Sequence, residues 1–339
     1  MDTAAFLITV DTEGDNLWAR PRTVTTRNAE YLPRFQSLCE KYGLKPTYLT
    51  NWEMARSDVF QSFGRDVLAR GVGEIGMHLH AWNSPPIVAL TGDDDRYAPY
   101  LIEYPPEQLR QKVRVMTQTL EETFGVKMLS HRAGRWSFNE TYAGALMENG
   151  YRIDCSVTPH VSWKFCKGAP AGRGGTDYSH FPESAYFLDL SDISRPGASP
   201  LLELPVTILG TRRYPRVVET VRKSLSGSFY GTIAMRRLFP DHQWLMPNGS
   251  NRAQMLQIVE SARRQQRPYI EMAIHSSELM PGGSPRFPTS ETIDRLYDDL
   301  EALFASATRH FRGRTLSEYY HHQTCGNAAE LARGGSARG

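Results

Sequence analysis

Short apolar segments alternate with amphipathic helical patterns along most of this 339-residue chain. A helix between two strands carries the chain back across the sheet, so this alternation predicts parallel strands in an α/β fold. The sheet can be open or closed into a barrel, and in both cases functional side chains gather at the carboxyl ends of the strands. Strands are predicted at 6–10, 44–50, 74–80, 128–132, 151–157 and 269–275, and helices at 28–42, 57–71, 107–124, 139–149, 252–264 and 291–307.

Other segments depart from this alternation. The stretches 82–106 and 159–183 are predicted to be long loops, and long loops in compact domains are usually functional or disordered. Strands at 186–190 and 201–208 could form an inserted hairpin, and a helix is predicted at 215–224. We expect a single domain over 1–325 and a disordered tail at 326–339, which is rich in Gly, Ala, Ser and Arg.

Composition and charge exclude several classes of protein. The net charge is +2 and no Lys/Arg cluster stands out, so nucleic-acid binding has no electrostatic support. No apolar run approaches the roughly 20 residues needed to span a bilayer. The start of the sequence lacks the basic and apolar parts of a secretion signal, so we expect a cytoplasmic protein. Its four scattered cysteines are then expected to be reduced.

Two pairs of polar residues stand at the ends of predicted strands. Asp11 and Glu13 follow the run 6–10, and His78 and His80 end the run 74–80. Residues i and i+2 of a strand point to the same face, so each pair presents both side chains on one side. If the two strands are neighbours, all four groups share one rim. Two imidazoles and one carboxylate form a recurring ligand set of catalytic zinc sites, which leaves the second carboxylate free to act as a base.

Three more polar residues, Arg132, Asp154 and His275, also fall at or near predicted strand ends. Taken singly, each has an ordinary structural explanation, because an arginine can form a salt bridge and an aspartate can cap a turn. Trp82 and Trp136 can likewise be core aromatics or line a sugar-binding groove. The concentration of all these groups at one predicted rim favours a catalytic site.

Five motifs, in this order along the chain, resemble those of the polysaccharide deacetylases, also called carbohydrate esterase family four. The resemblance extends over about residues 4–320, and segments 78–83 and 275–282 are similar to the WalW-like branch. It implies a distorted seven-stranded β/α barrel with long loop insertions and a metal-dependent removal of acetyl groups from N-acetylated sugars. The motifs are Thr9-Val10-Asp11-Thr12-Glu13, Glu74-Ile75-Gly76-Met77-His78-Leu79-His80, His131-Arg132-Ala133-Gly134-Arg135-Trp136, Asp154-Cys155-Ser156 and Ile274-His275-Ser276.

The resemblance also assigns catalytic roles to residues of this chain. Asp11 matches the catalytic base, and Arg132 matches the arginine that orients it. His275 matches the general acid, and Asp154 matches the carboxylate near that histidine. The side chains expected to contact the substrate are Trp82, Arg135, Trp136 and Leu279.

The metal ligands depart from the family pattern in one place. Glu13 and His78 match the metal carboxylate and the first metal histidine, with Glu13 where Asp is commoner. The family usually places a second histidine four residues after the first, and here that position is Trp82. His80 is the predicted replacement, with Asp15 as a reserve ligand. The resemblance implies a divalent metal, with Zn²⁺ as the expected ion.

These residues predict a hydrolase that removes an N-acetyl group from an amino sugar in a glycan precursor or glycoconjugate. Metal-activated water would attack the acetyl carbonyl, with Asp11 as base and His275 as acid. Two alternatives use the same residues. The chain could cleave a small non-sugar amide or another C–N bond, which a closed pocket capped by loop 82–106 would favour. It could also be a carbohydrate-binding protein that has lost catalysis. The motive for this hypothesis is Trp82, which stands where the family has its second metal histidine. Against it, binding alone does not need a base and an acid.

Overall fold

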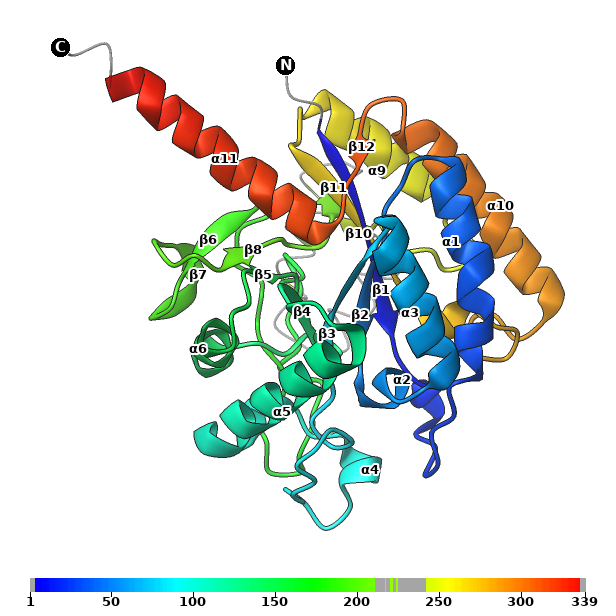
Figure 1. Ribbon diagram of the computed structural model, residues 1–339, viewed down its shortest axis with the longest axis vertical. Coiled ribbons are helices and arrows are strands. Elements are labelled where there is room, and N and C mark those ends of the chain that lie inside the picture. Colours follow the sequence, from blue (N-terminus) through cyan, green and yellow to red (C-terminus); the bar gives the residue numbers. More distant parts are fainter. Residues whose placement is uncertain (1–3, 211–216, 218–219, 222–223, 225–241, 336–339) are drawn as a thin grey trace.

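The computed structural model describes residues 4–210, 217, 220, 221, 224 and 242–335. A curled sheet forms its centre, and helices cover the outside of the sheet (Figure 1). The strands are β1 (Ala5–Thr12), β2 (Thr47–Thr50), β3 (Glu74–Leu79), β4 (Ser130–Ala133), β5 (Ile153–Asp154), β6 (Tyr186–Asp189), β7 (Asp192–Pro196), β8 (Leu202–Glu203), β9 (Ile208–Gly210), β10 (His242–Trp244), β11 (Tyr269–His275) and β12 (Arg312–Gly313).

The sheet has the order β11-β1-β2-β3-β4-β5-β8-β6-β7, and the seven strands from β11 to β8 run parallel. This confirms the predicted α/β fold with a seven-stranded parallel sheet. The register places Asp11 opposite His275 and His78 opposite Arg132. Strand β2 separates β1 from β3, so the two polar pairs do not lie on adjacent strands. They still share one rim, because β1, β2 and β3 are parallel.

The barrel is distorted where β8 faces β11. Among the described residues no regular ladder joins these two strands, and Leu245 bridges the gap instead. The Leu245 N–H donates to the carbonyl of Thr207 at 2.9 Å, and the Leu245 carbonyl accepts from the N–H of Ala273 at 3.3 Å. The predicted strand 186–190 pairs antiparallel with β8, but its hairpin partner is β7, because β8 is taken up as the last parallel strand.

Local sequence signals explain several helix ends. Helix α3 stops at Gly71, the end of the predicted helix 57–71, and the φ of 64° at Gly71 is a left-handed conformation that favours glycine. Helix α6 is capped by Asn139, whose side chain accepts a hydrogen bond from the N–H of Tyr142 at 2.9 Å. The helices are η1 (Leu17–Ala19), η2 (Arg27–Tyr31), α1 (Leu32–Lys41), α2 (Trp52–Ala55), α3 (Asp58–Arg70), α4 (Asp94–Tyr97), η3 (Leu101–Glu103), α5 (Pro106–Phe124), η4 (Gly134–Trp136), α6 (Glu140–Glu148), α9 (Arg252–Arg264), η5 (Ser276–Leu279), α10 (Ser290–Ala307) and α11 (Leu316–Gly335).

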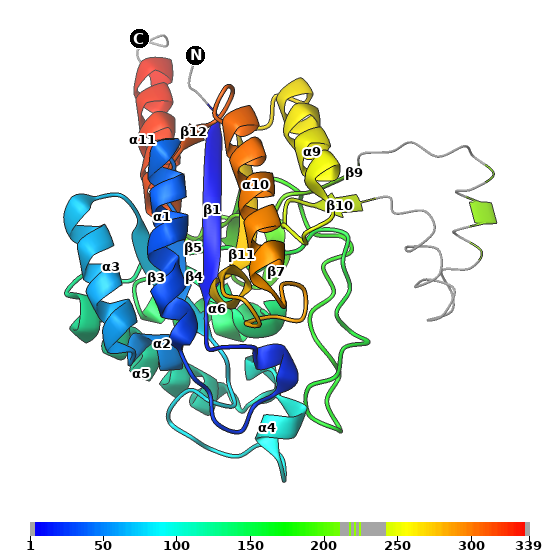
Figure 2. The ribbon, with the colours of Figure 1, turned by 90° about the vertical axis from the view of Figure 1, so that its right-hand side faces the viewer.

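Strand β1 divides the core because successive side chains point to opposite faces. On its outer face Phe6 packs edge-on against Phe304 of α10 at 5.9 Å, and Phe304 also contacts Phe35 of α1. Figure 2 shows α1 and α10 flanking β1 on this side. On the inner face Thr9 and Asp11 point into the barrel, where both accept hydrogen bonds from Arg132. The apolar outer face therefore holds the strand in place while the inner face supplies polar groups.

Helix α11 extends away from the barrel (Figure 1) and continues to Gly335, whereas the sequence predicts a disordered tail from residue 326. Residues 336–339 and most of the predicted helix 215–224 lie outside the described residues. None of the helices in the described ranges combines the length and the apolar character needed to cross a bilayer.

Candidate active site

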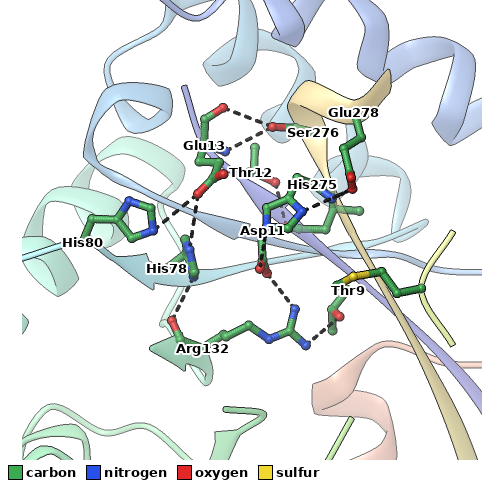
Figure 3. A network of polar contacts seen from close by, with 12 residues as sticks. Thr9, Asp11, Thr12, Glu13, His78, His80, Arg132, His275, Ser276 and Glu278 are labelled. Carbon is green, nitrogen blue, oxygen red and sulfur yellow. Dashed lines mark hydrogen bonds and ion pairs between the residues drawn. The ribbon is translucent and has the colours of Figure 1, made fainter. Parts of the chain in front are cut away.

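A cavity of about 870 Å³ opens at the carboxyl ends of the parallel strands. Its floor carries residues that the sequence singled out on three separate strands. Asp11 lies in β1 and Glu13 directly follows it, His78 lies in β3 and His80 directly follows it, and His275 ends β11. Figure 3 shows these side chains directed toward one another. The structure therefore brings the predicted metal ligands, base and acid into one place.

Glu13, His78 and His80 form a cluster with the spacing of a metal site. Oε2 of Glu13 lies 3.6 Å from Nε2 of His78 and 3.4 Å from Nε2 of His80, and all three side chains are buried. Two atoms that each bind one tetrahedral ion at about 2.1 Å lie about 3.4 Å apart, so these donors fit a shared cation. Hydrogen bonds between the Glu13 backbone and the Ser276 hydroxyl, at 3.1 and 3.2 Å, hold the end of β1 in place.

Both imidazoles are suited to bind a cation. Nδ1 of His78 lies 3.0 Å from the carbonyl oxygen of Arg132, a contact in which Nδ1 donates, and Nε2 is the nitrogen that faces Glu13. Burial holds the pKa of His80 well below its usual range, so this imidazole is neutral at neutral pH. Its ring stacks on Trp82 with centroids 4.5 Å apart. Trp82 thus packs against His80, the predicted replacement for the histidine missing at position 82.

Asp15 does not take part in this cluster. Its carboxylate accepts hydrogen bonds from the Thr25 hydroxyl at 2.7 Å, from the backbone N–H groups of Arg27 and Asn28, and from the Asn28 side chain at 2.6 Å. These bonds fold the loop after β1 back onto itself. The reserve-ligand prediction for Asp15 is therefore wrong, because the carboxylate is already used within its own loop.

Asp11 is held ionised by a buried arginine. Nη1 of Arg132 donates to Oδ1 of Asp11 at 2.6 Å, and Nη2 donates to Thr9 Oγ1 at 2.8 Å and to Glu271. Nε of Arg132 donates to the carbonyl of Cys155 at 3.0 Å. Burial alone would raise the pKa of Asp11, but Arg132 and two nearby histidines outweigh it and lower the pKa to about 2. Asp11 can therefore accept a proton at neutral pH.

His275 is held protonated by Glu278, which sequence reasoning did not identify as a functional residue. Nδ1 of His275 lies 3.2 Å from Oε2 of Glu278, and Nε2 lies 3.8 Å from Oδ2 of Asp11 (Figure 3). Burial alone would lower the pKa of His275, but the hydrogen bond to Glu278 and the carboxylates of Glu13, Glu278 and Asp11 raise it to about 9. His275 can therefore donate a proton at neutral pH.

The sequence assigned this partner role to Asp154, and the structure corrects the assignment. Asp154 lies opposite His131 in the β4–β5 register, and its Oδ1 is 2.6 Å from Nδ1 of His131. Glu278 occupies the position three residues after His275, the spacing at which a capping box also places a glutamate. That spacing was the signal available in the sequence.

Of the four residues predicted to contact substrate, three line the cavity and one does not. Trp82, Arg135 and Trp136 are on its wall. Leu279 is fully buried in the core below the cavity, so its prediction as a substrate-contacting residue is wrong. The short helix η5 turns this apolar side chain inward, away from the cavity.

Comparison with known proteins identifies the fold. No family model matches the chain, and no curated protein matches its sequence. A Mycobacterium smegmatis protein described as a candidate polysaccharide deacetylase superposes with a TM-score of 0.52 at 13% identity, over 96% of this chain and 92% of its own. A Parabacteroides distasonis protein described as a candidate glycoside hydrolase/deacetylase gives a TM-score of 0.59 at 9% identity, over 94% and 71%. The chain has the polysaccharide deacetylase fold.

Within this polysaccharide deacetylase fold, the His275–Glu278 pair predicts a specific pH dependence. An acid with a pKa of about 9 is lost as pH rises through 9, so activity should fall there. Glu278→Gln keeps a hydrogen-bonding group but removes the charge that favours the imidazolium. We expect the alkaline limb of the kcat/KM profile, which reports the free protein, to move down by at least about one pH unit.

The matched control for that experiment is Glu278→Asp, which keeps the charge and should restore part of the alkaline limb. Both variants are compared with wild type by recording kcat/KM between pH 6 and 10. An alkaline limb that stays near 9 in Glu278→Gln would show that Glu278 does not set the protonation of His275.

Proposed function

We propose that this chain is a metal-dependent deacetylase that removes an N-acetyl group from an amino sugar of a glycan precursor or glycoconjugate. We further propose that it belongs to the polysaccharide deacetylase family, in the WalW-like branch indicated by segments 78–83 and 275–282. One observation carries the proposal. An ionised Asp11 and a protonated His275 face each other at 3.8 Å beside the Glu13–His78–His80 cluster.

The donor set of one carboxylate and two imidazoles fits zinc. A divalent cation held by these three residues would polarise the acetyl carbonyl and make water more acidic. The other steps belong to residues of this chain. Asp11 takes a proton from the attacking water, and Arg132 fixes the orientation of that carboxylate. His275 gives its Nε2 proton to the amide nitrogen as the C–N bond breaks, so acetate and a free amine leave.

Aromatic side chains favour a sugar over a small amide as substrate. Five tryptophans line the cavity, and Trp244 contacts both Trp136 and Trp163 edge-on at 6.0 and 6.4 Å. Flat apolar ring faces suit the C–H faces of sugars. Loop 82–106 forms part of the cavity wall through Asn83, Asp95, Ala98 and Tyr100.

Acetate release is the direct test of this proposal. Protein reconstituted with Zn²⁺ is incubated with N-acetylated monosaccharides and oligosaccharides, and free acetate is measured. We expect release from at least one sugar, loss of release with a chelator and recovery on adding Zn²⁺. Release from N-acetylated amino acids but from no sugar would support the small-amide alternative. Sugar binding without release under any condition would support the binding protein.

A further inference from the structure

We propose that the substrate of this site carries an anionic group, a phosphate or a carboxylate, which binds Arg20, Arg22 and Arg135 at one wall of the cavity. The inference rests on the proposed function and narrows its substrate class to acidic N-acetylated sugars. The tryptophans around the cavity would hold the sugar ring, and the arginines would hold its charged substituent.

Charge on the cavity wall is unbalanced. Beyond the metal ligands, the base and the acid, the ionisable Asp, Arg and His side chains that line the cavity within the described residues are four arginines, Asp95 and His242. Arg286 is already neutralised, because its Nη1 lies 3.1 Å from Oε1 of Glu278. In the part of the chain that the structure describes, no carboxylate forms an ion pair with Arg20, Arg22 or Arg135. A wall with three unpaired guanidinium groups attracts an anion more strongly than a neutral sugar.

Two of these guanidinium groups are held in place by neutral acceptors. Nη1 of Arg20 donates to the carbonyl of Arg96, and Nη1 of Arg135 donates to the carbonyl of Ala98. Nη2 of Arg135 also donates to the carbonyl of Lys167 at 3.1 Å. Carbonyl groups orient a guanidinium without cancelling its charge. The carbonyl groups of Arg96 and Ala98 are only two residues apart in the chain, so the guanidinium groups of Arg20 and Arg135 lie along the same segment. Their remaining N–H groups can donate to an oxyanion.

The backbone at this wall is held in an uncommon conformation. The φ angles of Arg20, Ala98 and Arg135 are 50°, 47° and 55°, a backbone region that residues other than glycine rarely adopt. Such conformations cluster at ligand-binding and catalytic sites, where surrounding contacts maintain them. Burial lowers the pKa of Arg135, and the neighbouring charge of Arg20 acts in the same direction. A bound anion would supply the counter-charge that this pair of cations lacks.

Arg135 lies next to an aromatic side chain that is suited to contact the sugar ring. Arg135 and Trp136 are consecutive, and both line the cavity. The guanidinium of Arg135 lies 4.1 Å from the ring centroid of Tyr100, which fixes it against the wall from the other side. An acidic substituent on a sugar that rests near Trp136 would therefore lie close to Arg135.

Binding measurements test the proposal without relying on turnover. Isothermal titration calorimetry of zinc-loaded protein compares N-acetylglucosamine with N-acetylglucosamine 1-phosphate and with N-acetylmuramic acid. We expect at least one charged sugar to bind about tenfold or more tightly than the neutral one, a preference that weakens as salt is added. The two charged sugars distinguish a phosphate from a carboxylate as the group recognised.

Three variants make the test specific. Arg20→Gln/Arg22→Gln and Arg135→Gln should each reduce the preference for the charged sugar to about twofold or less. Arg195→Gln, at a side chain that is 75% exposed on β7 and outside the cavity, should leave it unchanged. Thermal unfolding checks that each variant is folded. If Arg135→Gln is unstable, Arg20→Gln/Arg22→Gln tests the proposal by itself, because both of its positions are exposed in a loop.

Equal binding of the neutral and charged sugars, or binding of none of them, would overturn the proposal. So would a preference that survives in the arginine variants, because the anion would then be held elsewhere, for example by the metal. Failure of this proposal leaves acetate release from neutral N-acetylated sugars in place. Failure of the proposed function removes acetate release from charged and neutral sugars alike, so the two outcomes are distinguishable.

Discussion

Replacement of Asp11 by Asn is expected to lower kcat for acetate release by about 10³-fold, within the range that a positioned general base contributes. Asparagine has nearly the same shape and can still accept the hydrogen bond that Arg132 donates at 2.6 Å. It cannot accept a proton from the attacking water. The variant should therefore still bind the sugar, with a Kd within about twofold of wild type.

The measurement is kcat from acetate release, combined with a titration of the sugar and a determination of bound metal in the same sample. Asp294→Asn is the matched control, because Asp294 forms a surface ion pair with Arg34 and its side chain is 66% exposed. That control should retain full activity. An Asp11→Asn protein that retains more than about a tenth of wild-type kcat would identify another group as the base.

Replacement of Arg132 by Gln is expected to lower the free energy of unfolding by about 3–5 kcal/mol. Arg132 is fully buried and is the cation that Asp11 and Glu271 share. Without it, Glu271 loses its counter-charge in the barrel interior and Asp11 keeps only the imidazolium of His275, 3.8 Å away. Burial, despite the charge of Arg132, already raises the pKa of Glu271 to about 7, which shows how unfavourable this environment is for a second negative charge.

Urea unfolding, followed by tryptophan fluorescence, measures the loss. Arg110→Gln is the matched control, because Arg110 pairs with Glu148 at 3.3 Å on the surface. Exposed pairs contribute at most about 1 kcal/mol, so the control should be nearly as stable as wild type. If the two variants lost the same stability, the buried network around Arg132 would not support the barrel in the way described.

The sequence predicts those parts of the site that depend on strand periodicity. Asp11 and Glu13, and His78 and His80, are two residues apart at strand ends, so their shared rim follows from the geometry of any parallel sheet. The fold class follows from the same alternation, and the structure confirms it. The presence of β2 between β1 and β3 does not disturb this result, because every parallel strand ends at the same rim.

Features that depend on strand order or on side-chain reach could not be predicted in this way. Asp154 contacts His131 because β4 and β5 are neighbours in register, and the sequence alone does not specify that register. Glu278 reaches His275 because a short helix follows β11 and folds the chain back within three residues. Both details depend on the three-dimensional path of the chain rather than on a periodic pattern.

The arginine-rich wall is a third such feature. Arg20 lies in the loop after β1, the carbonyls that anchor it and Arg135 lie near α4, and Arg135 follows β4. These three loops are far apart in sequence, and none of them carries a run of basic residues. The concentration of positive charge arises only because the folded chain brings these loops together at one cavity.

The account depends most directly on the metal site formed by Glu13, His78 and His80. Elemental analysis of protein incubated with Zn²⁺ and then dialysed should find about one equivalent of metal in wild type. His78→Ala/His80→Ala should bind almost none, whereas His321→Ala/His322→Ala, two histidines on α11, should bind as much as wild type. A wild-type protein without metal, or a His78→Ala/His80→Ala protein that still holds one equivalent, would contradict the account.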